Sequence, residues 1–329
     1  MKQTQFEDRN KELWLQLETQ LQIVTGPQLK EKTHTSIKLE QDFPAHYRQI
    51  CHHLALARSR GYSQALVNRL EQLVLTAHQQ LYRNHSHFLS SLIRYLVRDF
   101  PWRVRKEFRF VVLAAVLFFG PLIAMLVTIQ YAPDMVYTVL SGPTLEKMEN
   151  MYQPSSEKLG RDRASDSDFY MFGYYIFNNT SIGFRTFAGG LLFGLGSLFY
   201  LLYNGLHIGA VAGHLTHLGY KEIFWPFVAG HSAMELMAIV LSGAGGLKLG
   251  AALLKPGQRT RLRAVRETAI ECVHLIYGVI LMFFIAAFIE AFWSSNGSIE
   301  AQIKYAVGVV LWILVFAYFL FVGRNRHAD

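Results

Sequence analysis

The hydrophobic positions divide the chain into two parts. Up to about residue 107, apolar residues such as Leu66, Leu70 and Leu73 stand three or four positions apart among charged ones. This spacing places them on one face of an amphipathic helix. From residue 108 onward the apolar runs are long enough to cross a hydrocarbon core of about 30 Å. The pattern predicts an all-α protein, with a helical bundle at 1–107 and a multi-pass membrane domain at 108–329.

The N-terminal part contains three amphipathic segments. Their apolar stripes run through Trp14, Ile50 and Leu70, and Gly26-Pro27 and Gly61 interrupt the pattern between them. A stripe of this kind packs against other helices and forms the core of a bundle. The sequence therefore predicts a water-soluble bundle that precedes the membrane domain.

A basic cluster stands directly before the first long apolar run. It consists of Arg98, Arg103, Arg105 and Lys106, in a chain whose net charge is +8. Such clusters bind anionic lipid headgroups and remain on the cytoplasmic side. No nucleic-acid-binding motif accompanies the charge, so membrane lipids are the predicted partner and nucleic acid is not. The N-terminus begins without a signal peptide and is also expected in the cytoplasm.

The first predicted span covers 108–130. An acidic segment at 131–170 follows it and is expected as an outer loop, with a short helix near 144–152 and an aromatic stretch at the membrane interface. Arginines and a lysine at 255–266, and two arginines at the C-terminus, mark the cytoplasmic side again. The bacterial inner (cytoplasmic) membrane, with both termini in the cytoplasm, is the predicted location.

The charges constrain the number of spans. The last two spans, at 269–292 and 302–322, form a hairpin. An odd number of crossings must then connect the outer loop to the basic loop at residue 255. We expect three, at 184–203, 206–218 and 224–254, with an inner turn at Asn204-Gly205. The middle element is too short to cross a bilayer as a helix, and this predicts a half-helix or a broken element. The total is about six spans.

Ionisable residues stand inside the apolar sequence. His231 and Glu235 are four positions apart, so on a helix they share one face. Such residues are costly in a membrane and are candidate functional groups. The pair could relay protons, bind a cation or lock two helices together. The full candidate set is His231, Glu235, His214, Asn204, Glu290 and Arg185, of which Glu290 and Arg185 also suit the membrane interface.

Glycines recur in the same block at the spacing that permits close helix packing. Three pairs stand four positions apart, and their small side chains allow two backbones to approach each other. The predicted packing residues are Gly190, Gly194, Gly209, Gly213, Gly246 and Gly250.

No pattern typical of an enzyme is present. The HSAME segment at 231–235 lacks the second histidine of a zinc-protease helix, and the glycines form no phosphate-binding loop. The histidines at 52–53, 85 and 87 have no carboxylate or cysteine at ligand spacing. We therefore predict no catalytic residue, no metal site and no cofactor.

Several segments resemble the stage II sporulation protein M family. They include YIFNNTSIGFRTFAGG at 175–190, FVAGHSAMELMAIVLSGAGG at 227–246 and the turn at Pro256-Gly257. The N-terminal part resembles longer members outside the spore-formers, through FEDRNKELW, YRQICHHLALAR and VNRLEQLVLTAHQQLY. The resemblance covers about residues 108–322 in the membrane domain.

This resemblance implies a multi-pass inner-membrane protein without a transferable catalytic motif. The namesake acts in membrane migration during engulfment, in a complex that degrades peptidoglycan. The present chain departs from it by the added N-terminal bundle. Longer members are encoded beside a MoxR-type ATPase and other membrane proteins, which implies a membrane-assembly or envelope-stress complex.

Two functions remain open from the sequence. The first is a non-enzymatic scaffold, a homo-oligomer or a subunit of a larger membrane complex whose glycine-rich block packs the helices. The second is a transporter or channel for protons, ions or a small solute, with a cavity near His231 and Glu235.

Overall fold

A computed structural model describes residues 2–25, 34–81, 88–152 and 168–324, and these residues contain helices and turns but no strand. The all-α prediction is confirmed. The chain forms two compact units, Met1–Leu89 and Ser90–Asp329. We describe each unit by itself.

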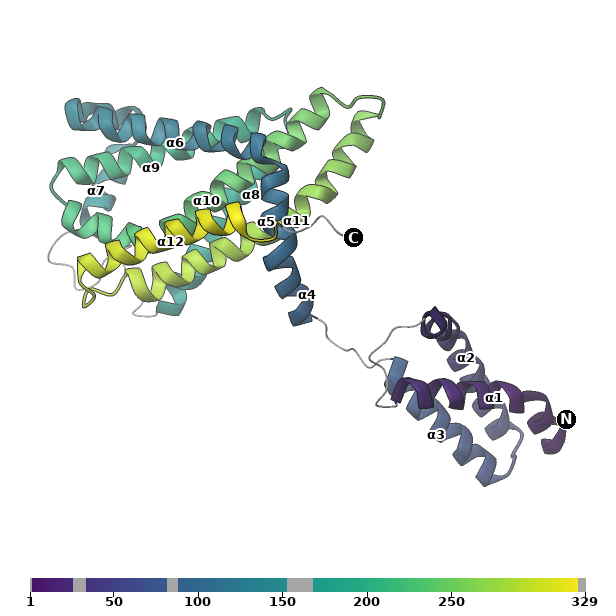
Figure 1. Cartoon of the computed structure of the whole chain (residues 1–329). Helices are drawn as coiled ribbons and strands as arrows, with labels where there is room; N and C mark the ends of the chain where they lie inside the picture. The colour runs from purple at the N-terminus through teal and green to yellow at the C-terminus, as the bar shows by residue number, and fades with distance from the viewer. Residues whose placement is uncertain (1, 26–33, 82–87, 153–167, 325–329) are drawn as a thin grey trace. The chain divides into compact units, whose positions relative to one another are not determined.

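The N-terminal unit contains α1 (Gln3–Thr25), α2 (His34–Ser59) and α3 (Gln64–Leu81), and α4 (Phe88–Arg94) begins at its end (Figure 1). The predicted stripes form its core, because Trp14, Ile50 and Leu70 are all almost completely buried. The turn between α2 and α3 contains Gly61 at a φ of 64°, a left-handed conformation that favours glycine. The predicted break at Gly26-Pro27 lies outside the described residues.

The second unit, here called the membrane unit, is a bundle of long helices. Its described elements are a π-turn η1 (Tyr95–Asp99), α5 (Phe100–Lys106), α6 (Phe108–Tyr131), η2 (Pro133–Thr138), α7 (Gly142–Met151), α8 (Asp168–Ala188), η3 (Gly189–Leu191), α9 (Leu195–His217), α10 (Lys221–Leu254), α11 (Arg261–Phe288), η4 (Ile289–Ser294) and α12 (Ala301–Phe321). Five helices of the described residues are long and apolar enough to cross a membrane: α6, α9, α10, α11 with η4, and α12.

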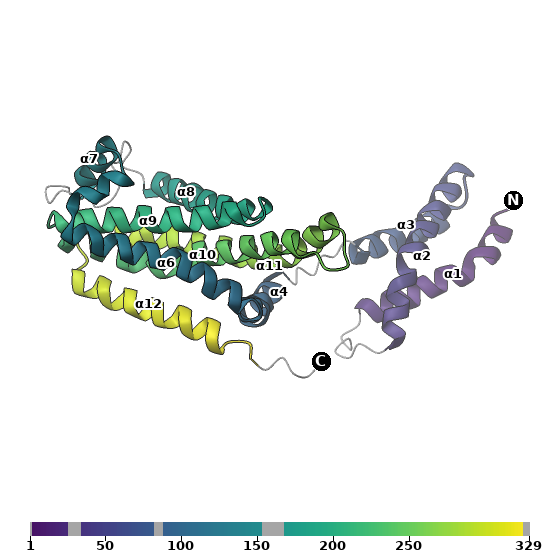
Figure 2. The same ribbon diagram turned by 90° about the horizontal axis from the view of Figure 1, so that it is seen from above.

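Helix α8 is the sixth long helix of the bundle, although it is less apolar than the other five. The directions of α6 and α9 show how α8 connects them. Gly205 of α9 lies against Phe118 of α6, and Gly213 lies against Leu126, so α6 and α9 run parallel. The chain must therefore return from the end of α6 to the start of α9, and α8 makes that connection. Figure 2 shows these helices side by side.

Three predictions about this region were wrong. The expected span at 184–203 is not one helix, because its residues are divided between the end of α8 and the start of α9. Asn204 and Gly205 form no turn, because α9 is one continuous helix over Leu195–His217, and the expected short element at 206–218 is its second half. The actual turn lies at 189–194, where Phe193 and Gly194 both have positive φ. The sequence does not distinguish a glycine that packs one helix against another, as Gly205 does, from a glycine that forms a turn. The turn at Asn204-Gly205 was predicted for this reason.

The segment expected as an outer loop at about 131–170 lies between α6, which ends at Tyr131, and α8, which begins at Asp168. The aromatic stretch from Phe169 onward forms the first half of α8. The short helix predicted near 144–152 is present as α7, and residues 153–167 lie outside the described part of the chain. Aromatic residues of α8 pack on α11 and η4, as Phe172 does against Phe284 and Phe292.

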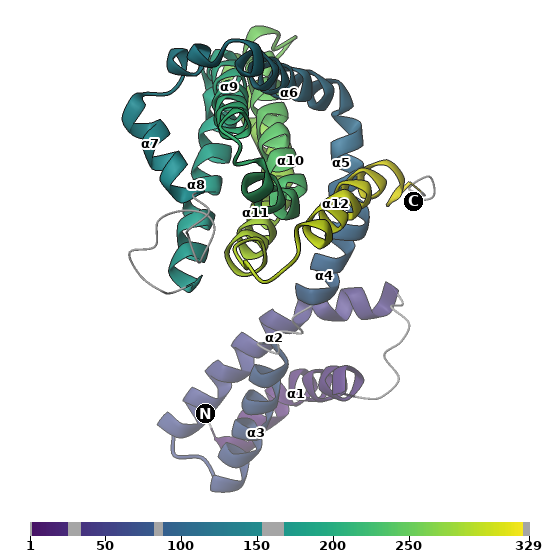
Figure 3. The ribbon, with the colours of Figure 1, turned by 90° about the vertical axis from the view of Figure 1, so that its left-hand side faces the viewer.

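Helix α10 lies at the centre of the membrane unit. Figure 3 looks along the bundle and shows α10 among α8, α9, α11 and α12. It is the most buried of the five candidate spans, with 67% of its most apolar window inside the structure. The side chains of α10 therefore face protein on most sides, and a polar group on this helix meets other helices.

Helix α5 lies across one end of the bundle, which we call the basic face. Its Phe100 and Val104 belong to the same core as α10 and α11, so the structure divides the chain after Leu89 and not at the predicted position 107. The opposite face carries η2 and α7.

Candidate functional site

Three ionisable side chains meet inside the membrane unit. His231 and Glu235 are one turn apart on α10, and the His231 Nε2 atom lies 3.7 Å from the Glu235 Oε2 atom. Glu290 comes from η4, and its side chain is buried against the same group. The exposed fractions are 5% for His231 and 9% for Glu290. We call these three residues the His231 cluster.

The π-turn η4 brings Glu290 to this place. Its extra residue per turn changes the direction of the side chains at the end of α11, and single π-turns often occur at functional sites. Ala287 and Ala291, on either side of Glu290, pack with Tyr175 of α8. The small alanines let α8 approach η4 closely, and this encloses the cluster.

The imidazole of His231 is fixed by its neighbours. Its Nδ1 atom lies 3.1 Å from the hydroxyl of Ser294, and its ring packs edge-on against Phe227 at a centroid distance of 5.3 Å. Gly230 lets α10 pack closely on η4, since a Cβ at this position would overlap the ring of Trp293. The cluster is thus part of a tight joint between α10 and η4.

A buried lysine supports the same joint from α12. The Lys304 ammonium group donates to the carbonyls of Ser294 and Asn296, both at 2.8 Å. These contacts hold the turn that follows η4, and with it the Ser294 hydroxyl beside His231. Lys304 was not singled out from the sequence, although a lysine in the first turn of an apolar helix is a recognisable signal.

The cluster has the donor atoms of a metal site. One donor atom from each of His231, Glu235 and Glu290 can be chosen so that all lie within 4.8 Å of one another. The sequence shows only the first two as a pair, because Glu290 belongs to a different helix.

The other predicted polar residues lie elsewhere. His214 of α9 pairs with Glu149 of α7, with Nε2 and Oε1 2.7 Å apart. The Asn204 amide donates to the carbonyl of Tyr200 in its own helix. Arg185 is exposed in the last turn of α8. The structure therefore brings three of the six candidates together and separates the rest.

The six predicted packing glycines lie at close contacts, but Gly190 and Gly194 belong to the turn between α8 and α9, which packs on α10, and do not form a pair on one helix. A Cβ on Gly190 would overlap the Gly246 carbonyl, and a Cβ on Gly250 would overlap the backbone of Gly194. Gly209 lies against the backbone of Leu122. Gly213 packs on Ile129 and Leu126. Glycine permits backbone atoms to touch at these positions, which is how helices associate in lipid.

The family of the chain follows from a match to a family model. A model described as stage II sporulation protein M matches residues 110–295, more than half of the 329 residues. The chain belongs to the stage II sporulation protein M family. The resemblance seen in the sequence is confirmed. A second model, described as a domain of unknown function (DUF8413), matches residues 4–83. No curated protein and no solved structure matches the chain.

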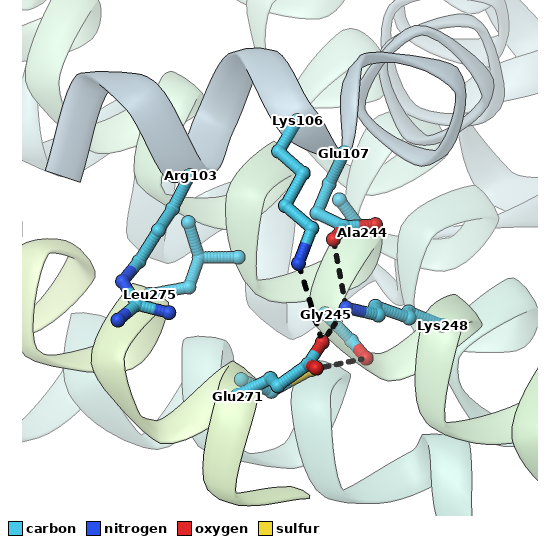
Figure 4. A pocket seen from close by; sticks show the side chains of 9 residues that line it. Arg103, Lys106, Glu107, Ala244, Gly245, Lys248, Glu271 and Leu275 are labelled. Atoms are coloured by element: carbon cyan, nitrogen blue, oxygen red, sulfur yellow. Dashed lines mark hydrogen bonds and ion pairs between the residues drawn. The ribbon is translucent and has the colours of Figure 1, made fainter. Parts of the chain in front are cut away.

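This family member has a second polar site, at its basic face. Lys248 of α10 donates to Glu107 at 2.7 Å and to Glu271 of α11 at 2.6 Å, while Lys106 lies 3.9 Å from Glu271 (Figure 4). The ion pairs surround a cavity of about 20 Å³, enough for about one water molecule. They connect the junction between α5 and α6 to α10 and α11.

The predicted basic cluster lies around α5 in the structure of this family member. Arg105 donates to the carbonyl of Phe319 in α12 at 2.8 Å, and Lys106 lies over the ring of Trp102. Arg98 precedes the helix in η1. Arg103 lines the small cavity beside Lys248. Part of this charge therefore connects helices at the basic face, which sequence reasoning had assigned to lipid alone.

Proposed function

We propose that the chain is a non-enzymatic scaffold of an envelope-associated complex in the bacterial cytoplasmic membrane. Its membrane unit belongs to the stage II sporulation protein M family and holds several apolar helices. Its N-terminal unit is a separate compact body with its own core. A membrane anchor joined to a soluble bundle is suited to bringing other proteins to the membrane surface.

The observation that carries the proposal is the tight joint around His231. The imidazole is 5% exposed and is held by Ser294 and Phe227, and the neighbouring Gly230 is in contact range of Trp293. Besides the cavity at the basic face, the described residues enclose one between α11 and α12, beside Phe100, and one beside Ser242, and all three are lined by residues other than His231 and Glu235. This geometry supports a role in connecting helices.

The basic face gives the proposal an orientation. Arg103, Arg105 and Lys106 gather there, and positive residues near membrane helices remain in the cytoplasm. With that face inside, both termini and the N-terminal unit are cytoplasmic, and α7 faces the outside. The N-terminal unit would then meet cytoplasmic partners such as a MoxR-type ATPase. The faces of α6 and α12 would meet lipids, a second copy or other membrane subunits.

A flux and assembly experiment tests the scaffold role. The full chain is reconstituted in vesicles, and the fluxes of protons, Na⁺ and K⁺ are compared with those of empty vesicles. In parallel, the mass of the assembly extracted from membranes in mild detergent is measured. We expect no flux above the empty vesicles, and an assembly larger than one chain.

Two variants make the result specific. Glu235→Gln should reduce the assembled fraction and leave the flux at background, while the matched change Glu146→Gln, at an exposed position of α7, should change neither. A flux in the wild type that Glu235→Gln abolishes would contradict the scaffold proposal, as would a chain that is always extracted as a monomer.

Transport is the second candidate function. The observation in its favour is the gathering of His231, Glu235 and Glu290 inside the bundle, because ionisable residues in membrane helices often mark ion pathways. The broken helix expected at 206–218 does not support it, since α9 is continuous there. The flux experiment decides between the two candidates.

A further inference from the structure

We propose that His231, Glu235 and Glu290 bind one divalent transition-metal ion, of the class of Zn²⁺, which connects α10 to η4. The proposal does not depend on the scaffold function, because such an ion would serve a transporter equally well. It begins from the donor atoms, which come from two helices and converge in the interior of the membrane unit.

The spacing of the donors suits a single ion. Bonds from Zn²⁺ to imidazole nitrogen and to carboxylate oxygen are about 2.0–2.2 Å long, so two ligands of one ion lie at most about 4.4 Å apart. His231 and Glu235 are already within this limit, at 3.7 Å, and the whole set lies within 4.8 Å. Neighbouring ligands of one tetrahedral ion lie about 3.4 Å apart, so the carboxylate oxygens must move inward by about 1 Å, which a rotation of the glutamate side chains provides.

The distance between His231 and Glu235 also argues for a shared ion. A hydrogen bond between nitrogen and oxygen is about 2.7–3.2 Å long. The 3.7 Å separation is longer than this and is close to the separation of about 3.4 Å between neighbouring ligands of a tetrahedral ion. The arrangement therefore fits an ion between the two groups better than a direct contact.

Ser294 gives His231 the support that metal-binding histidines usually have. Such a histidine binds the metal through one ring nitrogen and donates its other N–H to an oxygen, which fixes the tautomer and the ring plane. Here Nδ1 lies 3.1 Å from the Ser294 hydroxyl oxygen, and Nε2 faces Glu235. Nδ1–H can donate to Ser294, and the lone pair of Nε2 then points at the ion.

The ligand chemistry selects the class of ion. A buried imidazole nitrogen is a ligand for Zn²⁺, Fe²⁺, Ni²⁺ or Cu²⁺, whereas Mg²⁺ and Ca²⁺ prefer oxygen alone. Two carboxylates in the interior of a membrane unit carry negative charge that a divalent cation neutralises. Three protein ligands with one position left for water is a common Zn²⁺ arrangement.

The test uses the full chain in lipid nanodiscs, stripped with a chelator and then titrated with ZnCl₂ in the presence of excess Mg²⁺. After desalting, the retained zinc is measured by mass spectrometry. We expect about one ion per chain. A hundredfold excess of Zn²⁺ over its Kd should raise the apparent Tm by about 5–10 °C.

Variants identify the ligands. His231→Ala and Glu290→Gln should each reduce zinc affinity more than Ser294→Ala, which should weaken it about 10–100-fold. Glu149→Gln, which alters the separate histidine–glutamate pair with His214, should retain the ion. Co²⁺ bound to the unaltered chain should show visible absorption bands, and this measurement needs no variant that could fail to fold.

Three results would overturn the proposal. One is a wild type that retains less than a tenth of an ion per chain and shows no Co²⁺ bands, which would mean that a shared proton neutralises the carboxylates. The second is zinc retention by Glu290→Gln equal to that of the wild type. The third is loss of zinc in Glu149→Gln but not in His231→Ala.

Discussion

The two units of this chain use opposite kinds of residue to hold their helices together. The core of the N-terminal unit is built from large side chains, among them Trp14, Ile50 and Leu70, whose exposed fractions are 1% or less. In the membrane unit the closest helix contacts involve glycines, such as Gly190 against Gly246. Many of the large side chains there are exposed at the surface of the unit, as at Val116 and Ile313.

The difference follows from the surroundings of each unit. In water, burial of large apolar side chains provides most of the driving force for folding. In lipid the surroundings are as apolar as the protein, so this force is missing and close contact between backbones replaces it. Removal of a large buried side chain should therefore be most costly in the N-terminal unit, and addition of a methyl group to a packed glycine should be most costly in the membrane unit.

The largest effect is expected for Trp14→Ala in the N-terminal unit. The indole packs with Phe6 and donates to His53 at 3.1 Å, and its loss should lower the free energy of unfolding by about 3–5 kcal/mol. Hydrogen exchange of the full chain measures this as lost protection in α1–α3. Leu75→Ala, at an exposed position of α3, is the control and should change it by about 0.5 kcal/mol or less. Equal losses in both variants would contradict the assignment of this core.

A smaller effect is expected at the basic face. Lys248→Met leaves Glu107 and Glu271 without their shared ammonium group and should lower stability in detergent by about 1–3 kcal/mol. The matched variant Lys106→Met removes the 3.9 Å contact with Glu271 and the contact with the ring of Trp102, both at a half-exposed side chain, and should cost about 1 kcal/mol or less. Chemical unfolding of both proteins gives the comparison. A larger loss of stability in Lys106→Met than in Lys248→Met would contradict the central role of Lys248 in this network.

The smallest effect is a pH dependence confined to the N-terminal unit. Burial, followed by the nearby His52, lowers the pKa of His53 below its ordinary value of 6.5. The unfolded chain then binds a proton more readily than the folded one, so stability is full above pH 6.5 and falls as the pH drops through that value. Hydrogen exchange at pH 7.5 and 5.5 should show lower protection in α1–α3 at the lower pH. His53→Gln should reduce the dependence.

Much of the fold could be predicted from the sequence, because hydrophobic spacing alone separates the two units. The core at Trp14, Ile50 and Leu70 is predictable because each residue lies on the single apolar face of its helix, and the other faces carry charged residues that stay in water. The family resemblance and most membrane helices were equally visible. The prediction failed where α8 carries polar and aromatic residues instead of a plain apolar run, and where Gly205 packs a helix and does not form a turn.

The candidate site could be predicted only in part. His231 and Glu235 are visible as a pair because a helix brings residues four positions apart onto one face. Glu290 was only a weaker candidate, because its contact depends on how η4 packs on α10. Lys248 and Glu107 were missed for the same reason: their pairing joins distant segments, and no local pattern encodes it.

The pair of variants Gly190→Ala and Gly120→Ala tests most directly the claim that backbone contacts at glycines hold the membrane unit together. A methyl group at position 190 would overlap the Gly246 carbonyl, whereas position 120 on α6 has nothing within 4 Å. Unfolding in mixed detergent micelles should show a loss of about 1–3 kcal/mol for Gly190→Ala. Gly120→Ala should be unchanged or more stable by up to about 1 kcal/mol. Equal stability of the two variants would contradict the claim that glycine contacts hold the membrane unit together.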